Sequence, residues 1–169
     1  MILSLFLLLP ALLPFEILEH QQLLARLACS EAGWSRKEAA RVLRVVRNRA
    51  ELRKTSIVVE ATRPYQFNYR VCTGKKAKWL RNFHYSLALT TLLGDIRAKE
   101  SVLNNKLVTH YATKKRLTAK HRRCRGYTIQ QVWEWTGLRP VFSSEVNHVF
   151  FKRPKSGRLK PGCPPTTVN

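Results

Sequence analysis

The chain lacks the short motifs that identify several large enzyme classes. It contains no G-x-x-x-x-G-K-[ST] or G-x-G-x-x-G phosphate-binding loop, no H-E-x-x-H zinc-protease motif and no G-x-S-x-G nucleophile motif. Nucleotide-binding, zinc-protease and serine-hydrolase functions therefore have no support in the sequence. There is no internal repeat either, and 169 residues are enough for one domain with a real core.

Acidic residues are scarce. The chain has 10 Asp and Glu against 31 Lys and Arg, which gives a formal net charge of +21. The basic residues are spread from Arg26 to Lys160 rather than gathered in one tail. Such an excess predicts an anionic partner: nucleic acid, an anionic membrane surface or an anionic cell-wall polymer.

Closely spaced cysteine pairs are also absent. The four cysteines are Cys29, Cys72, Cys124 and Cys163, and none forms a C-x-x-C pair. Zinc sites usually show close ligand pairs, and His121-x-x-Cys124 alone is a weak signal, so no metal site is predicted. An even number of cysteines in a chain with an export-like leader predicts two disulfides, with three possible pairings.

The longest apolar run is too short for a standard membrane span. It covers residues 2–13 and is interrupted by Pro10 and followed by Pro14. It fits the hydrophobic region of an export signal, although no basic residue precedes it. We expect residues 1–18 to be a signal peptide or an uncleaved anchor, residues 19–152 to be the folded domain and residues 153–169 to be a Pro-, Gly- and Lys-rich tail. A buried apolar N-terminal helix is the alternative.

Glu31 is the candidate catalytic residue. Apolar side chains of residues 23–28 share one face of a predicted helix, and Glu31 follows where that helix ends. Gly33 can adopt the left-handed conformation that closes a helix, and Ser35–Glu38 reads as a capping box that opens a second helix to about Lys54. A carboxyl group at such a place can be partly desolvated and protonated near neutral pH, as a general acid must be. The alternative is a solvated surface glutamate.

The remaining pattern predicts a mainly α fold with a small irregular or β element. Residues 55–62 suit a short helix or an extended segment, and residues 75–99 suit one long helix. Residues 107–113 form a short apolar and aromatic segment. Thr128–Gln131 reads as a second capping box that opens a short helix closed by Gly137, and residues 142–151 are extended or turn-like.

Four sequence elements occur in the order typical of one family. They are Leu24-Ala25-Arg26-Leu27…Glu31-Ala32-Gly33 with Val45-Val46-Arg47-Asn48-Arg49, then Gln66-Phe67, then Val108-Thr109-His110-Tyr111, and finally Asn147-His148-Val149-Phe150-Phe151. In this order they resemble the SleB-type cell-wall hydrolase family, the catalytic domain of spore-cortex-lytic and related peptidoglycan lytic enzymes. The resemblance covers nearly all of the chain after the leader. It implies a lysozyme-like, mainly α, α+β single domain that cleaves the MurNAc–GlcNAc β-1,4 bond.

The resemblance also implies roles for particular residues. Glu31 matches the catalytic acid of the family, and no metal or cofactor is needed. The residues assigned to substrate positioning are Tyr65, Gln66, Phe67, His110 and Tyr111, with His148 assigned either to substrate or to a structural hydrogen bond. No other acid lies in an evident second active-site motif, which favours a lytic transglycosylase over a two-carboxylate hydrolase. For a hydrolase, the second carboxylate would come from Glu60, Asp95, Glu100, Glu134 or Glu145.

Two departures separate the chain from the family pattern. Gly33-Trp34 replaces the usual Gly-Glu, and the basic run over residues 114–123 replaces a Pro-Trp element, so substrate preference does not carry over. A basic nucleic-acid-binding protein that stacks bases on its tryptophans, and a catalytically idle wall-binding or phage-borne lysis protein, are the alternative functions. The leader and the absence of a nucleic-acid motif favour an exported monomer, in the periplasm, cell wall or extracellular space, that acts on peptidoglycan glycan strands and anionic wall polymers.

The charge excess generates a prediction about salt. If many exposed Lys and Arg side chains attach the protein to an anionic wall, the attachment should weaken strongly as salt rises. The Debye length falls from roughly 10 Å at 0.1 M to about 3 Å at 1 M ionic strength. Pull-down on purified walls across this range measures the effect. Binding that salt leaves unchanged would show that specific sugar contacts, rather than net charge, supply the affinity.

Overall fold

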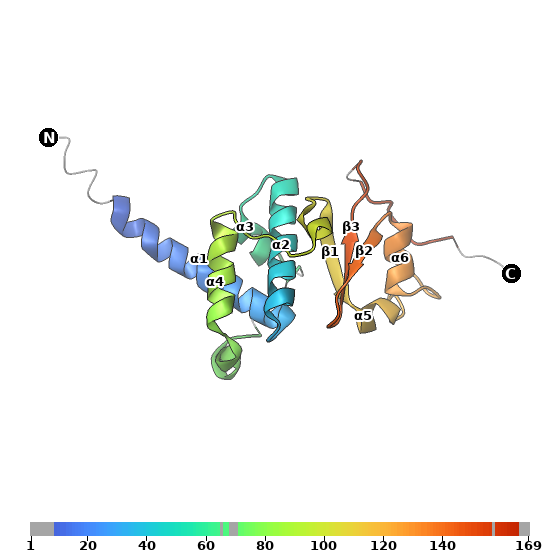
Figure 1. Ribbon diagram of the computed structural model, residues 1–169. Coiled ribbons are helices and arrows are strands. Elements are labelled where there is room, and N and C mark those ends of the chain that lie inside the picture. The colour runs from blue at the N-terminus through green and yellow to red at the C-terminus, as the bar shows by residue number, and fades with distance from the viewer. Residues whose placement is uncertain (1–8, 65, 68–70, 157, 166–169) are drawn as a thin grey trace. The chain divides into compact units, whose positions relative to one another are not determined.

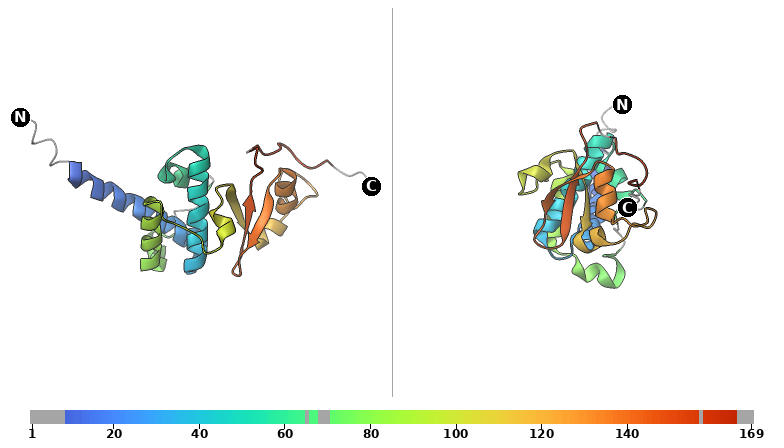
Figure 2. Two further views of the ribbon diagram at one scale, coloured as in Figure 1. Left: turned by 45° about the horizontal axis from the view of Figure 1, so that its top comes forward. Right: turned by 90° about the vertical axis from the view of Figure 1, so that its right-hand side faces the viewer.

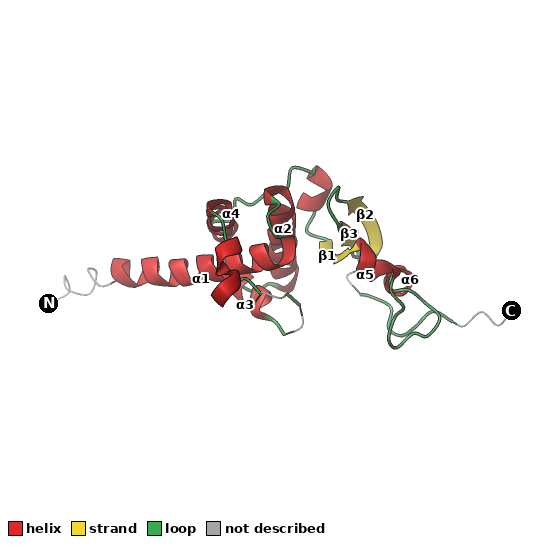
Figure 3. Ribbon diagram, turned by 90° about the horizontal axis from the view of Figure 1, so that it is seen from below, coloured by secondary structure: helices red, strands yellow, loops and turns green. Residues whose placement is uncertain are grey.

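Helices build the N-terminal unit of the chain, residues 1–99, and a small sheet with short helices builds the second unit, residues 100–169. The computed structural model describes residues 9–64, 66–67, 71–156 and 158–165 (Figure 1). The strands that it describes all lie in the second unit (Figure 3). The predicted class, mainly α with a small β element, is confirmed.

In the first unit the elements are α1 (Leu9–Ala32), α2 (Arg36–Arg53), α3 (Ile57–Thr62), the 3-10 helix η1 (Gly74–Trp79) and α4 (Asn82–Leu92). Helix α1 packs against α2, α3 and α4, and α2 packs against α3 and α4 (Figure 1). The predicted apolar face of α1 forms this core, since Leu24 and Leu27 are fully buried together with Val42 and Val46 of α2 and Ala88 of α4. Each large aliphatic side chain buried in this way contributes about 1.5–3 kcal/mol.

Helix α1 is longer than the sequence pattern predicts. It begins at Leu9 rather than near Glu19, so the predicted boundary between residues 18 and 19 falls inside the helix. No helix in the described part of the chain is both long and apolar enough to cross a membrane.

The N-terminus of α2 forms one half of the predicted capping box. Ser35 Oγ accepts the backbone N–H of Glu38, at 3.2 Å. The Glu38 carboxylate pairs with the Arg41 guanidinium at 2.9 Å, and both side chains are buried. Leaving a buried guanidinium without a counter-charge costs more free energy than leaving a helix end without a cap. This explains why the Glu38 carboxylate faces Arg41.

The prediction of one long helix over residues 75–99 is wrong. Leu80 and Arg81 have extended backbone between η1 and α4, and α4 ends before Gly94, whose φ is +87°. Apolar residues continue through this segment, but the buried side chains lie in α4, and η1 has none. The break is stabilised by His84, whose Nδ1 accepts the backbone N–H of Arg81 at 2.9 Å.

In the second unit the elements are η2 (Ser101–Asn104), β1 (Val108–Thr113), α5 (Lys114–Thr118), α6 (Ile129–Trp135), β2 (Arg139–Ser143) and β3 (His148–Lys152). The sheet is antiparallel, in the order β1-β3-β2, with α5 and α6 on one side of it (Figure 2). A buried cluster of Ala112, Leu117, Leu138 and Phe151 joins the sheet to the two helices. Thr128 and Gln131 form the complete capping box that the sequence predicts, and Gly137 ends α6 with a φ of +99°.

Both predicted disulfides are present, one in each unit. Cys29 pairs with Cys72 and Cys124 pairs with Cys163, which selects one of the three possible pairings. The second bridge holds the C-terminal tail through Cys163. The first joins α1 to the loop that precedes η1.

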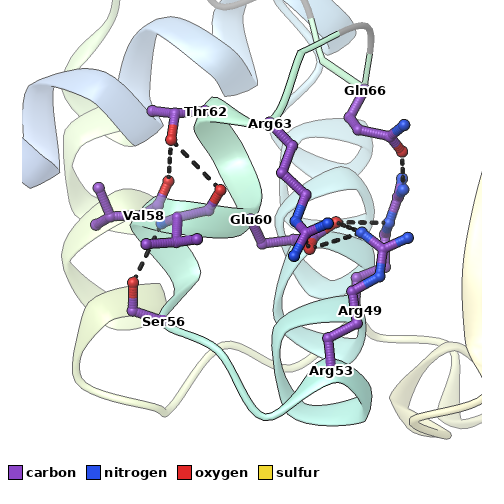
Figure 4. A network of polar contacts seen from close by, with 9 residues as sticks. Arg49, Arg53, Ser56, Val58, Glu60, Thr62, Arg63 and Gln66 are labelled. Carbon is purple, nitrogen blue, oxygen red and sulfur yellow. Dashed lines mark hydrogen bonds and ion pairs between the residues drawn. The ribbon is translucent and has the colours of Figure 1, made fainter.

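A buried carboxylate with several cationic partners connects α2, α3 and the loop after α3. Glu60 is fully buried, and its oxygens lie 2.9 Å from Arg49 Nε, 2.7 Å from Arg53 Nη1 and 3.2 Å from Arg63 Nε (Figure 4). Arg49 is itself buried, whereas Arg53 and Arg63 reach solvent. Glu60 therefore has a structural role in the first unit.

We expect Glu60→Gln to destabilise the first unit strongly. The amide keeps the shape but leaves the buried guanidinium of Arg49 without a counter-charge, and removing one partner of a buried ion pair costs about 3–5 kcal/mol. Two of the arginines reach water, so a value near the lower end is expected. Urea unfolding measures it. The matched control is Glu51→Gln, which breaks the exposed Arg47–Glu51 pair and should cost under about 1 kcal/mol. Equal costs for the two variants would contradict this account.

Candidate active site

The turn that carries Glu31 has the geometry that the sequence predicts. Glu31 lies in the last turn of α1, and Gly33 follows with a φ of +57°. The N–H of Gly33 donates to the Cys29 carbonyl oxygen at 2.9 Å, which closes the helix. The Glu31 side chain is half-buried.

The Cys29–Cys72 disulfide fixes the end of α1 from one side. Cys29 lies two residues before Glu31, and the neighbouring Ser30 Oγ accepts the backbone N–H of Cys72 at 3.2 Å. A covalent bond and a hydrogen bond thus connect the same short stretch of α1 to one loop. This loop is the continuation of the segment that contains Gln66 and Phe67.

His84 fixes the same turn from α4. Its Nε2–H donates to the Gly33 carbonyl oxygen at 2.9 Å, while Nδ1 accepts the Arg81 N–H. A neutral imidazole has one donor and one acceptor, and both are used here. The structure places His84 in the core, with no exposed surface. Its partner Gly33 is 51 residues away, so no local pattern could have indicated this role.

Burial lowers the pKa of His84. The hydrogen bond to the Gly33 carbonyl opposes this shift, and the positive charge of Arg81 adds to it. Protonation would place a hydrogen on Nδ1, where the Arg81 N–H already points. The neutral form is therefore the one that fits the turn.

Gln66 and Phe67 both contact Arg49, one of the arginines that pair with Glu60. Gln66 Oε1 accepts a hydrogen bond from Arg49 Nη2 (Figure 4). The Arg49 guanidinium also lies 5.1 Å from the centre of the Phe67 ring. Gln66 is exposed and available to a ligand, whereas Phe67 is 9% exposed and anchors the loop. The prediction for Tyr65 falls on a residue outside the described part of the chain.

The other predicted binding residues belong to the second unit. His110 and Tyr111 lie on β1, and His148 begins β3. His110 Nδ1 lies 2.9 Å from Thr109 Oγ1, and its ring packs edge-on against Trp133. Tyr111 and His148 contact each other edge-on, with ring centres 5.3 Å apart, and His148 is buried. The structure thus brings Tyr111 and His148 together on the sheet, while Glu31, Gln66 and Phe67 belong to the first unit.

In the described part of the chain, no three His, Cys, Asp or Glu side chains gather as metal ligands would. Comparison with known proteins adds no assignment: no family model, no curated protein and no solved structure matches the chain. The SleB-type resemblance therefore stays a prediction that rests on the sequence elements themselves.

The His84 geometry predicts a loss of stability in weak acid. Because the folded pKa is lowered, the unfolded state binds more protons, and stability falls as pH drops from about 6.5 through the folded pKa. Above the unfolded value the contribution is complete. Thermal unfolding of wild type and His84→Gln between pH 8 and 5 isolates it, because the amide does not titrate. The difference between the two proteins should shrink as pH falls; a constant difference would contradict the assignment.

Proposed function

We propose that the chain is a peptidoglycan-cleaving enzyme of the SleB-type family, with Glu31 as general acid and base at the MurNAc–GlcNAc β-1,4 bond. The observation that carries the proposal is the burial and the fixed position of this one carboxyl group. It is half-buried, it lies at the end of an apolar helix, and the turn beside it is fixed by a disulfide and by His84. Proton transfer in a transition state requires a positioned group, and a fixed turn supplies the position.

Three carboxylates of the first unit are paired with arginines, which supports a mechanism with one acid. Glu38 is paired with Arg41, Glu51 with Arg47, and Glu60 with its three arginines. Glu60 was a candidate for the second carboxylate of a hydrolase, but it has no exposed surface on which to meet a sugar. A lytic transglycosylase needs no second carboxylate.

The proposed reaction passes one proton through Glu31 and back. The protonated carboxyl donates to the oxygen that leaves C1 of the muramyl residue, and the glycosidic bond breaks. The resulting carboxylate then takes the proton of the muramyl 6-hydroxyl, whose oxygen forms a bond to C1. The products are a 1,6-anhydromuramyl end and a strand with a new hydroxyl, and Glu31 is again protonated.

Charge and disulfides support a place outside the cytoplasm. Disulfides persist mainly in oxidising compartments, and the two bridges join residues within their own units. A net charge of +21 suits a substrate embedded in anionic polymer. We infer an exported monomer that acts on glycan strands without a metal or cofactor.

Replacing Glu31 tests the proposal. Glu31→Gln cannot donate the proton, and because Glu31 acts in both steps, muropeptide release should fall by about 10⁴-fold or more, the top of the range for one general acid. Folding and wall binding should persist. Glu19→Gln, an exposed carboxyl on the same helix, is the matched control and should retain activity.

Mass analysis of the products separates the mechanisms. Fragments lighter by one water than hydrolysis products indicate the anhydro ring, whereas reducing ends indicate a hydrolase with a carboxylate still to be found. Full activity in Glu31→Gln would refute the proposal. If wild type releases nothing, a gel-shift assay with nucleic acid tests the alternative class.

A further inference from the structure

A hollow of about 580 Å³ lies next to the Glu31 turn in the first unit. It is lined by Trp34, Leu80, Arg81, Asn82 and Phe83. Trp34 follows the turn at the end of α1, and the other four residues lead into α4. The volume falls within the roughly 300–1,000 Å³ typical of ligand sites. None of these residues takes part in the proton transfers proposed for Glu31.

Trp34 is the most unusual residue of the hollow because 67% of its surface is exposed. The Arg81 guanidinium lies 5.2 Å from the centre of the indole ring, and its Nη1 donates to the Lys78 carbonyl oxygen at 3.1 Å. A guanidinium has five N–H donors, so this bond leaves others able to reach an anion. An exposed indole beside a guanidinium offers an apolar face and a cationic edge together.

The two walls of the hollow are fixed relative to each other by His84. One ring nitrogen bonds to the carbonyl oxygen of Gly33, the residue before Trp34, and the other to the N–H of Arg81. Because the imidazole is buried, neither bond competes with water. Preformed geometry of this kind lowers the entropic cost of binding a ligand.

We propose that this hollow is a glycan subsite for a pyranose that carries a carboxylate, as a muramyl residue does through its lactyl ether where no stem peptide is attached. The C–H face of the sugar stacks on Trp34, the carboxylate binds the Arg81 guanidinium, and the Asn82 amide reaches a hydroxyl or acetamido group. The inference rests on the proposed function, since it names the substrate class of the same site. Three residues of chain span at most about 11 Å, so a sugar held here lies near the bond that Glu31 would cleave.

The charges of the hollow favour an acidic sugar over nucleic acid. Among the described residues that line it, Arg81 is the one that carries a charge. A single-stranded nucleic acid carries a phosphate on every nucleotide and is bound in grooves with several cations. A peptide-free glycan strand, which carries one lactyl carboxylate on alternate sugars, matches one guanidinium. The Trp34 position is also where the chain departs from the family's Gly-Glu pattern.

The subsite can be tested by NMR titration of the Glu31→Gln protein, which would leave the glycan intact. The probes are a peptide-free GlcNAc–MurNAc tetrasaccharide and chitotetraose, a neutral tetrasaccharide. The indole N–H resonance of Trp34 should shift with either glycan, and the acidic one should bind more tightly. Trp34→Ala should weaken both by about tenfold, and Arg81→Gln should remove the preference for the acidic glycan.

Trp135 provides a matched control in the second unit. It is 36% exposed, and Lys160 Nζ lies 5.1 Å from the centre of its ring, so it repeats the exposed indole with a cation. Trp135→Ala should leave both affinities unchanged. Thermal unfolding of each variant confirms that the exposed substitutions leave the fold intact.

The outcomes separate this inference from the proposed function. Unchanged affinities in Trp34→Ala, an equal loss in Trp135→Ala, a preference that survives Arg81→Gln, or displacement of the glycan by single-stranded DNA would each overturn the subsite. Wild-type protein that releases no muropeptide, while Trp34 and Arg81 behave as expected, would overturn the enzyme and leave the subsite. Full cleavage that does not depend on Trp34 would overturn the subsite and leave the proposed enzyme function in place.

Discussion

The two hydrogen bonds of the buried His84 imidazole are the constraint on which the first unit's proposed site depends. One fixes the Gly33 carbonyl beside Glu31, and the other fixes the Arg81 N–H at the start of α4. Residues next to these bonds can stay exposed and still hold a defined position, because the backbone rather than side-chain packing places them. Trp34 and Arg81 are such residues. The Cys29–Cys72 bridge restrains the same turn through α1, so the turn is held by elements distant in sequence.

The scarcity of acidic residues determines how the rest of the unit is stabilised. Glu38, Glu51 and Glu60 all form ion pairs with arginines of the same unit. Glu60 by itself connects α2, α3 and the loop that follows α3. Buried ion pairs add little net stability compared with apolar side chains, but separating them is costly, so they disfavour other arrangements. In these described ion pairs the carboxylates bind arginines rather than lysines. A basic exterior and a carboxylate-poor site therefore have one origin in the composition.

Local chemistry explains what the sequence could predict. Gly33, Ser35, Thr128 and Gly137 end or begin helices through contacts within a few residues, and the structure has those ends where the pattern places them. The break at Leu80 and Arg81 depends on His84, whose other partner is 51 residues away, so a continuous apolar stripe was misread as one helix. The choice among three cysteine pairings likewise depends on tertiary contacts. In the predicted site, the motif residues divide between the first unit and the sheet of the second unit, and the hollow beside Trp34 arises from two segments that no motif connects.

The proposed function separates attraction, orientation and chemistry by length scale. Net charge acts over roughly 10 Å at 0.1 M salt and brings the protein to any anionic polymer, but it cannot set the register of a strand. Register requires contacts at van der Waals and hydrogen-bond distance, which an exposed indole and a guanidinium on a fixed turn can supply. Proton transfer requires still tighter placement of one carboxyl group, and that group lies at the end of the same turn. A substitution that altered only Trp34 would thus change which sugars are held without altering the acid.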